Sequence, residues 1–167
     1  MSAYVTTTDR AAIIRAALKA KGWNARKVSV RADYYSMGSS LHVTIKDADV
    51  PLAVVEAIAN EHESIDRDQF GDILSGGNRF VHVRYSSEAN AVLTARYLPV
   101  VAAAAAEVDA SVDDRRLFPI DGTEYLVGRG YNNYGYSLWH SGRGHVQTAN
   151  TPDYLASVLA VRLQEAA

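Results

Sequence analysis

Two short segments in which apolar and polar residues alternate place the strongest constraint on the fold of this chain. Every second residue is apolar over 27–32 and again over 40–46, and the stretch 33–39 between them is rich in turn-forming residues. A period of two indicates a strand with one buried face, so we predict an antiparallel hairpin. The apolar face of this hairpin needs other elements to cover it. The polar face carries Ser29, Arg31, His42 and Thr44.

Helical spacing of apolar residues predicts helices on either side of the hairpin. The first spans about 9–21 and follows a run of threonines that can cap its free N–H groups. The second is expected to be capped by Asp49. The acidic segment 61–72 is expected to loop outward. A glycine-rich turn at 75–78 then leads into a third strand, 79–85.

A third helix is expected to follow, capped by Ser86 or Ser87. Pro99 interrupts it, because proline lacks the N–H group that a helix interior uses, and this favours a kink or a restart. The alanines of 102–106 continue the helix. They are explained by helix propensity or by close packing against a sheet or a second copy of the chain. The most apolar stretch, 98–108, is too short to cross a bilayer.

The remaining residues indicate a β-meander and a final helix. The polar link 111–116 is the expected domain boundary. The last helix starts at Thr151, with Pro152 at its first position. Short alternating segments fill the space between. These expected strands cover 117–120, 125–128, 134–139 and 146–148.

These elements define an α+β fold class. We expect a mainly antiparallel sheet with helices packed on one face, in the order α-β-β-α-β-α, followed by the β-meander and the C-terminal helix. Residues 1–110 would form one α+β domain. Residues 111–167 would form an extension that can pack into the same domain.

Composition excludes several classes of protein. Lys and Arg number 17 against 19 for Asp and Glu, which gives a formal net charge of −2. The chain therefore has neither the basic excess of many nucleic-acid-binding proteins nor the acidic excess of a DNA mimic. Cysteine is absent, which excludes disulfides, thiolate metal sites and a cysteine nucleophile. Residues 1–10 lack the blocks of a signal peptide, and we expect a cytoplasmic protein.

The histidines do not form a recognisable metal or catalytic motif. His140 and His145 flank a loop, but that loop contains Arg143, whose charge disfavours a cation, and no further ligand is evident. No nucleophile elbow or phosphate-binding glycine pattern is present. We therefore expect no cofactor, no metal and no catalysis. An enzyme that uses His140 or His145 as acid–base groups is the third-ranked hypothesis.

The segment 128–145 is the main candidate for binding, because it contains no acid and combines aromatic, Arg, His and Gly residues. Aromatic rings stack on bases or fill pockets in proteins, and arginines pair with phosphates or carboxylates. Three interpretations stay open: aromatics of a meander that face its core, a protein-binding site, and a nucleic-acid-binding site. The expected contacts are Arg129, Tyr131, Tyr134, Trp139 and Arg143.

A second, smaller surface is expected around the first hairpin. Its cations and tyrosines could contribute to nucleic-acid binding, and the alternative is a strand edge with tyrosines in the turn. This surface comprises Arg26, Lys27, Arg31, Tyr34 and Tyr35.

Four short stretches carry a family resemblance. These stretches are 14–19 (Ile-Arg-Ala-Ala-Leu-Lys), 28–31 (Val-Ser-Val-Arg), 35–43 (Tyr-Ser-Met-Gly-Ser-Ser-Leu-His-Val) and 76–81 (Gly-Gly-Asn-Arg-Phe-Val). Together they resemble the twenty-ninth family of large polyvalent protein-associated domains over about residues 10–85. The family has a tryptophan and a Gly-Pro step after the second strand, where this chain has Ile45 and 47–51.

The resemblance implies a protein of a phage or a conjugative element. It implies an accessory factor that serves the incoming element, such as an anti-CRISPR or anti-restriction inhibitor. The expected partner is a host defence protein or complex, nucleic acid is the alternative partner, and no membrane is expected. The chain would act as a monomer or a homodimer.

Overall fold

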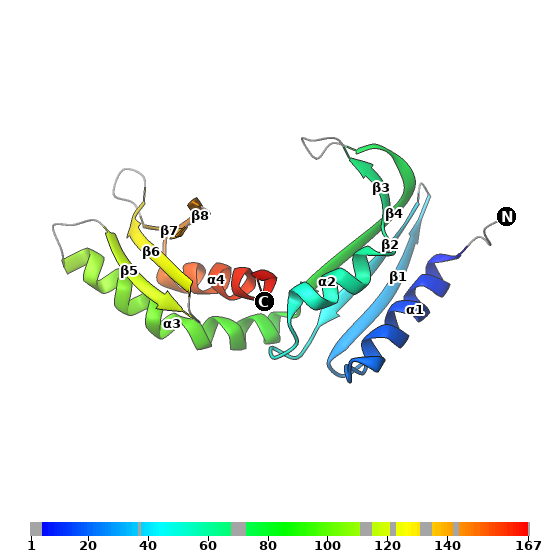
Figure 1. Ribbon diagram of the computed structural model, residues 1–167, viewed down its shortest axis with the longest axis horizontal. Helices are drawn as coiled ribbons and strands as arrows, with labels where there is room; N and C mark the ends of the chain where they lie inside the picture. Colours follow the sequence, from blue (N-terminus) through cyan, green and yellow to red (C-terminus); the bar gives the residue numbers. More distant parts are fainter. Residues whose placement is uncertain are drawn as a thin grey trace. The chain divides into compact units, whose positions relative to one another are not determined.

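The computed structural model contains two four-stranded sheets and four helices in its described residues (Figure 1). The α+β class expected from the sequence is confirmed. The structure describes residues 5–36, 38–67, 73–110, 115–120, 123–130, 135–141 and 144–166, without the side chains of 64–79, 123 and 161–166.

The chain forms two compact units. The first comprises Met1–Ala89 with Gln164–Ala167, and the second comprises Asn90–Leu163. A compact unit is defined by its internal packing, whereas a domain folds independently. The division into domains 1–110 and 111–167 therefore stays a prediction.

Helix α1 (Thr7–Ala20) begins with a reciprocal capping box. The Thr6 hydroxyl accepts the backbone N–H of Asp9 at 3.1 Å, and the Asp9 carboxylate accepts the backbone N–H of Thr6 at 3.1 Å. Each contact satisfies an N–H group that the helix leaves without a partner. The hydroxyl and the N–H of Thr6 also lower the pKa of Asp9. The predicted threonine cap is therefore confirmed.

Strands β1 (Val28–Tyr35) and β2 (Gly38–Ile45) form the predicted antiparallel hairpin. Val28 pairs with Ile45 at one end and Tyr35 pairs with Gly38 at the other. The expectation that 33–39 forms the turn is wrong, because most of it extends the two strands. Tyrosine favours strands, and cross-strand pairing continues through both tyrosines of β1.

Helix α2 (Leu52–Asn60) lacks the expected side-chain cap from Asp49. Pro51 occupies the N-cap position, and no side chain bonds to the free N–H groups there. The side chain that organises the preceding turn is Asp47, whose carboxylate accepts the backbone N–H of Asp49 at 3.0 Å. The prediction that Asp49 caps α2 was wrong because aspartate favours turns as well as helix starts.

Two strands replace the loop and the turn expected after α2. Strand β3 (Ser64–Arg67) lies in the segment expected to loop outward, and β4 (Ile73–Tyr85) includes the glycine-rich stretch 75–78. The predictions were therefore wrong for 64–67 and for 75–78, and residues 68–72 of the expected loop lie outside the described residues. The pairing of β3 with β4 is antiparallel and shifts register between Ser64 and Ile65. Glycine within a strand often marks such an irregularity.

The strands of the first sheet follow the order β1-β2-β4-β3. Strands β2 and β4 are parallel, and α2 lies on the connection between them. A parallel pair requires a crossover of this kind, whereas an antiparallel pair can use a tight turn. The other pairings described in the two sheets are antiparallel, as the sequence predicts.

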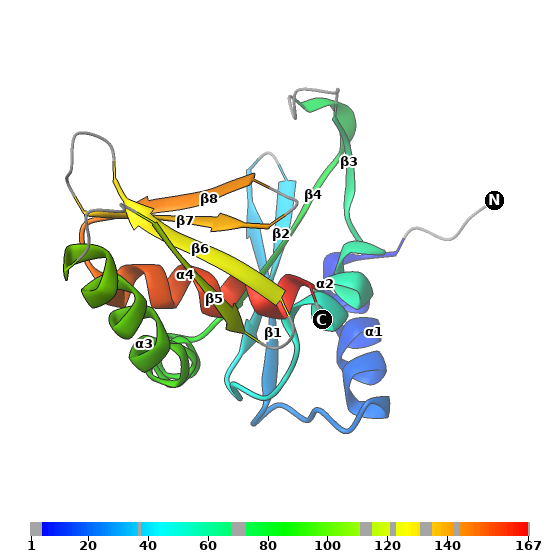
Figure 2. The ribbon, with the colours of Figure 1, turned by 60° about the vertical axis from the view of Figure 1, so that its left-hand side comes forward.

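Helices α1 and α2 lie on the same side of the first sheet (Figure 2). The apolar residues of β1, β2 and β4 share this side because they occupy alternate positions in register. No helix of the first unit covers the opposite side of the sheet in its described residues. Core side chains of this unit with 1% exposure or less include Ile14, Leu18, Leu41, Val43, Ile45 and Val55.

Helix α3 (Ser87–Ala110) is capped by Ser86, one of the two predicted caps. The Ser86 hydroxyl accepts the backbone N–H of Ala89 at 3.1 Å. The helix continues through Pro99 without the restart that the sequence allowed. Ala104 and Ala105 are buried, whereas Ala103 and Ala106 are exposed. The alanine run therefore packs along one face only.

Helix α3 is long and apolar enough to cross a membrane by length and composition alone. The length argument made for residues 98–108 is therefore wrong. Val101, Ala105 and Val108 are at most 1% exposed, and α3 lies against the meander sheet (Figures 1 and 2). One face of α3 is therefore packed within the second unit, whereas Val92 and Val100 of the same helix are exposed. The absence of membrane binding stays a prediction.

The second sheet is the predicted β-meander, with antiparallel neighbours in chain order. The backbone N–H of Tyr154 bonds to the hydroxyl of Thr151 at 3.4 Å, so the final helix begins where the sequence predicts. Helices α3 and α4 lie on the same side of this sheet (Figure 1). The elements are β5 (Arg115–Ile120), β6 (Thr123–Arg129), β7 (Tyr136–His140), β8 (Gly144–Ala149) and α4 (Pro152–Ala166).

Leu41 offers a direct test of the first core. It is fully buried at the centre of β2, and truncation leaves a cavity. We expect Leu41→Ala to lower the free energy of unfolding by about 2–5 kcal/mol. Urea denaturation followed by circular dichroism measures this loss. Ile13→Ala is the matched control, because Ile13 is 47% exposed, and it should change stability by less than about 1 kcal/mol. Equal effects of the two substitutions would contradict this packing.

Candidate functional site

Arg129, expected to contact a partner, lies at the end of β6 and forms an ion pair within the second unit. Its Nη1 is 3.3 Å from the Oδ1 atom of Asp109, and its Nη2 donates to the backbone carbonyl of Asp109 at 3.4 Å. A partner would therefore compete with an existing carboxylate. The structure gives Arg129 an internal role that the sequence did not indicate.

Tyr136 contacts the same carboxylate. Its hydroxyl donates to the Oδ2 atom of Asp109 at 2.6 Å. This hydrogen bond, burial of the ring and the charge of Asp109 raise the pKa of Tyr136, and Arg129 opposes the change. Asp109 thus joins the end of α3 to β6 and β7. From the sequence, Asp109 was predicted only to lie near the end of a helix. Its contacts could not be predicted, because its partners Arg129 and Tyr136 are distant along the chain.

Trp139 lies on the face of the meander that points away from α3 and α4. Its neighbour Leu138 is fully buried beneath the sheet, and alternate residues of a strand point to opposite faces. The Trp139 ring meets the edge of His145 at 5.7 Å between centroids. The Arg115 guanidinium carbon lies 5.6 Å from the ring centroid. The tryptophan is therefore held between a cation and an imidazole, and it is half-buried.

Apolar and polar residues extend the surface around this tryptophan. Leu117 is 63% exposed. The His145 Nε2 atom lies 3.0 Å from the Thr148 hydroxyl, which fixes the imidazole against β8. The pairing of β6 with β7 places Leu126 directly beside Trp139. We call this set the meander surface, comprising Arg115, Leu117, Leu126, Trp139 and His145.

Three residues of the predicted site lie outside the described residues. They are Tyr131, Tyr134 and Arg143. Of the predicted five, the structure therefore places Arg129 and Trp139, and it gives them different environments. Arg129 is paired on the helix-covered side, and Trp139 lies on the open side.

His140 and His145 do not share a site. The His140 ring meets Tyr125 edge to face at 5.4 Å, on the helix-covered side of the sheet. The His145 ring meets Trp139 on the other side. Within the described parts of the chain, no group of three His, Asp or Glu side chains is arranged to hold a metal ion. Catalysis by either imidazole stays a hypothesis.

The second predicted surface is divided between different environments. Lys27 forms an ion pair with Asp47 at 2.9 Å, and this contact raises the pKa of the lysine. The hydroxyl of Tyr34 accepts the backbone N–H of Thr8 at 3.1 Å, so Tyr34 packs toward α1. Tyr35 is exposed and lies on the opposite face of the sheet from Tyr34. Arg31 lies on the same face as Tyr35. Arg26 is exposed in the turn before β1. The five residues do not form one patch.

A cluster of rings on the open face of the first sheet was missed from the sequence. The rings of His42 and His82 stack with centroids 5.2 Å apart. The ring of Phe80 is nearly parallel to that of His82, at 6.4 Å and 6°. The parallel pairing of β2 with β4 sets His42 directly beside His82. We call His42, Phe80 and His82 the sheet platform. Alternation in 79–85 could have placed Phe80 and His82 on one face, but no local signal indicates the partner strand.

Polar contacts hold one edge of the sheet platform. The Asp33 carboxylate accepts from the Arg31 guanidinium at 2.8 Å and lies 3.3 Å from the Nε2 atom of His42. The Ser40 hydroxyl lies 3.0 Å from the same Nε2 atom. The hydrogen bond from Arg31 is the main cause that lowers the pKa of Asp33. The His42 ring is therefore positioned by groups from two neighbouring strands.

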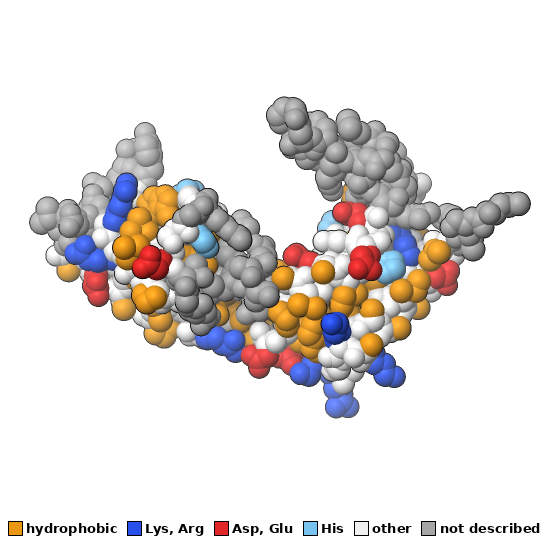
Figure 3. Space-filling view, viewed as in Figure 1, with side chains coloured by type: hydrophobic (Ala, Val, Ile, Leu, Met, Phe, Trp, Pro, Cys, Tyr) orange, Lys and Arg blue, Asp and Glu red, His pale blue; other side chains and the backbone are white. Residues whose placement is uncertain are grey.

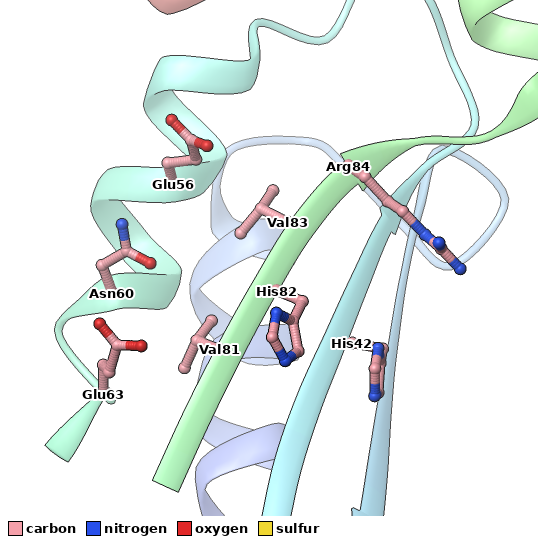
Figure 4. Close-up of a pocket in the computed structure, with 8 residues that line it drawn as sticks. All are labelled: His42, Glu56, Asn60, Glu63, Val81, His82, Val83 and Arg84. Carbon is pink, nitrogen blue, oxygen red and sulfur yellow. The ribbon is translucent and has the colours of Figure 1, made fainter. Parts of the chain in front are cut away.

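A hollow of about 620 Å³ lies beside β4. Figure 4 shows Val81 and Val83 pointing toward α2, while Arg84 extends in the other direction, over β2. Glu56, Asn60 and Glu63 line the α2 side of the hollow, and His42, His82 and Arg84 line the other side. The acidic side chains are thus separated from the rings by β4.

The described part of the face in Figure 3 has no single dominant sign of charge. Acidic and basic side chains are interspersed over the described part of the face in Figure 3. This agrees with the small net charge of −2. Any charge-dependent binding must therefore depend on local arrangements of residues.

The fold and these surfaces define an α+β protein that carries two sheets, each with helices on one side. Residues 5–98 match Large polyvalent protein associated domain 29. Because this match covers more than half of the chain, the chain belongs to that family. Such domains occur in large polyvalent proteins, which associates the chain with mobile genetic elements. The resemblance noted for residues 10–85 is confirmed.

The match includes the whole first sheet and ends within α3, so the meander lies beyond it. No curated protein and no solved structure shows a significant match to the chain.

The contact between Asp109 and Tyr136 can be tested by titrating the Tyr136 hydroxyl. We expect Asp109→Asn to lower the pKa of Tyr136 toward its ordinary value near 10.0, because the amide carries no charge to oppose the phenolate. The native contact stabilises the fold fully below that value, and its contribution is lost as the pH rises through the raised pKa. Tyrosine absorbance or carbon NMR across the titration measures the change.

Glu107→Gln is the matched control for this titration. It removes a carboxylate from the same helix, but one that contacts Arg116 at 3.7 Å. It should leave the titration of Tyr136 unchanged. An identical titration of Tyr136 in wild type and Asp109→Asn would show that this geometry is wrong.

Proposed function

We propose that the chain is a non-enzymatic binding protein of a mobile genetic element that engages a host defence protein or complex. It would act in the host cytoplasm without a cofactor, as an anti-CRISPR or anti-restriction inhibitor. The observation that carries the proposal is the position of Trp139, held between Arg115 and His145 on the open face of the meander.

The composition of the meander surface supports a protein partner. Tryptophan and arginine are among the residues that dominate binding energy at protein interfaces. Their contacts limit the motion of the tryptophan ring before a partner arrives, which reduces the entropy lost on binding. Leu117 adds an exposed apolar side chain next to them. A surface of this kind gains free energy when a complementary protein excludes water from it.

Family membership supports the biological setting of the proposal. A domain of large polyvalent proteins belongs with factors that serve a mobile element, and host defence systems are the main obstacle that such an element meets. The target class is thus inferred from the family, and the contact surface is inferred from side chains. The monomeric or dimeric state of the chain is not specified by either argument.

Nucleic-acid binding through segment 128–145 is the weaker alternative. Of the two arginines in this segment, Arg129 contacts Asp109, and Arg143 lies outside the described residues. A phosphate would have to compete with the Asp109 carboxylate for the Arg129 guanidinium. The described residues therefore favour a protein partner for the meander.

Protection of a targeted plasmid tests the proposed function. Transformation efficiency is measured in hosts with an active CRISPR or restriction system, with and without expression of the chain. We expect wild type to restore transformation in one of these hosts. Trp139→Ala should lose most of this protection, because truncating a central interface residue typically weakens binding about 30-fold or more.

Tyr154→Ala is the matched control, because it also removes an exposed aromatic ring, which lies on α4 and is 53% exposed. It should protect as well as wild type. With a purified target complex, inhibition should saturate at stoichiometric amounts of the chain. Inhibition at far lower ratios would indicate an enzyme. Full protection by Trp139→Ala would contradict the assignment of the meander surface.

A further inference from the structure

The open face of the first sheet has a chemistry that the meander surface does not explain. Val, Leu, Ile and Ala side chains of β1, β2 and residues 80–85 of β4 point toward α1 and α2, and the alternate residues, Phe80 among them, point away from both helices. Three of those alternate residues form the sheet platform, with ring centroids 5.2 Å and 6.4 Å apart. We infer that this face binds single-stranded nucleic acid. The inference does not depend on the proposed function.

The position of the rings fits stacking of unpaired bases. The platform lies on β2 and β4, which are the central strands of the sheet order β1-β2-β4-β3. His42 lies between β1 and β4, whereas the pairing of β3 with β4 ends at Arg79, so in the described pairings Phe80 and His82 have a paired strand on the β2 side alone. Phe80 and His82 are nearly parallel, which suits successive bases of one strand. Sheets that carry rings on adjacent central strands bind unpaired bases by stacking.

The charges on this face frame the platform. Within β1, β2 and residues 80–85 of β4, the charged side chains on the open face are Arg31, Arg84 and Asp33. Arg31 has 77% of its side chain exposed, and its guanidinium pairs with Asp33 at 2.8 Å, so a phosphate would share it with that carboxylate. Two cations against one carboxylate give the face a local excess of positive charge. Phosphates next to stacked bases would be attracted to it.

The acidic side chains lie where they restrict the path of the strand. Glu56 on α2 and Glu63, which follows the end of α2, lie on the far side of β4. Arg84 extends the other way, over β2 (Figure 4). Repulsion from the carboxylates and attraction to the arginines both place the phosphates over β1 and β2. The bases then lie over His42 and His82.

A single strand fits this face better than a duplex. In a duplex the flat surfaces of the bases are covered by neighbouring bases, so rings on a sheet cannot reach them. The face offers two arginines, which is a small number of phosphate contacts. The logarithm of the affinity should therefore fall with the logarithm of salt concentration with a slope of only about −1.4. Stacking supplies the rest of the binding free energy.

Fluorescence anisotropy with the full chain tests the inference. The probes are fluorescein-labelled oligothymidylate and oligouridylate of twelve nucleotides, and a duplex of the same length. We expect saturable binding of at least one single-stranded probe and much weaker binding of the duplex. The two single-stranded probes distinguish DNA from RNA as the natural ligand.

Substitutions on the platform separate stacking from a structural effect. His82 is exposed, so its truncation should leave the fold intact. His82→Ala should weaken binding about fivefold or more, and His82→Tyr should restore it by supplying another ring. Arg84→Gln should weaken binding and reduce the salt slope by about 0.7. Lys21→Gln, which removes an exposed cation at the end of α1, is the control and should change neither quantity.

Several results would overturn the inference. These are absence of binding to both single-stranded probes, equal binding of the duplex, or unchanged affinity in a folded His82→Ala variant. Loss of binding in Trp139→Ala with retention in His82→Ala would assign nucleic acid to the meander instead. That last result would also count against a protein partner for the meander surface, whereas the other results leave plasmid protection by that surface untouched.

Discussion

The parallel pairing of β2 with β4 is the constraint on which the first unit depends. It places Leu41, Val43 and Ile45 of β2 beside Val81, Val83 and Tyr85 of β4, which gives α1 and α2 a continuous apolar surface to cover. The same register necessarily aligns the polar positions on the reverse side. His42 and His82 therefore meet as a consequence of how the core is built.

Both sheets follow the same physical plan and differ in what their open faces carry. In each sheet, helices bury one face, and the other face is free of helix cover from its own unit. The first open face presents stacked rings framed by arginines. The second presents a tryptophan beside a cation and an exposed leucine. Two faces of different chemistry within one short chain favour two different classes of partner.

Local signals predicted the elements that depend on nearby residues. Alternation at Leu41, Val43 and Ile45 predicted the hairpin, and hydroxyl caps predicted the starts of α3 and α4. The stretch 75–78 was wrongly predicted as a turn, because glycine serves both turns and irregular strands. Tyr34 and Tyr35 were also predicted to lie in a turn, but pairing with β2 extends strand β1 through both residues.

The candidate sites were harder to predict because they depend on contacts between distant residues. Segment 128–145 directed attention to Trp139, which the structure places half-buried on the open face of the meander, but the pairing of Arg129 with Asp109 joins residues that no motif connects. The sheet platform depends on which strand lies beside β2. A crossover through α2 decides that neighbour, and the sequence of neither strand indicates it. Residue type thus pointed to binding chemistry, and topology decided where the groups meet.

Proton NMR of the isotopically labelled chain tests the parallel pairing most directly. The predicted nuclear Overhauser contacts join the His42 ring to the His82 ring, Leu41 to Val81, and Ile45 to Tyr85. This set requires β2 and β4 to run in the same direction. Absence of the contact between the two histidine rings, with Ile45 contacting the start of the 79–85 segment, would show an antiparallel pairing. That result would contradict both the core and the sheet platform.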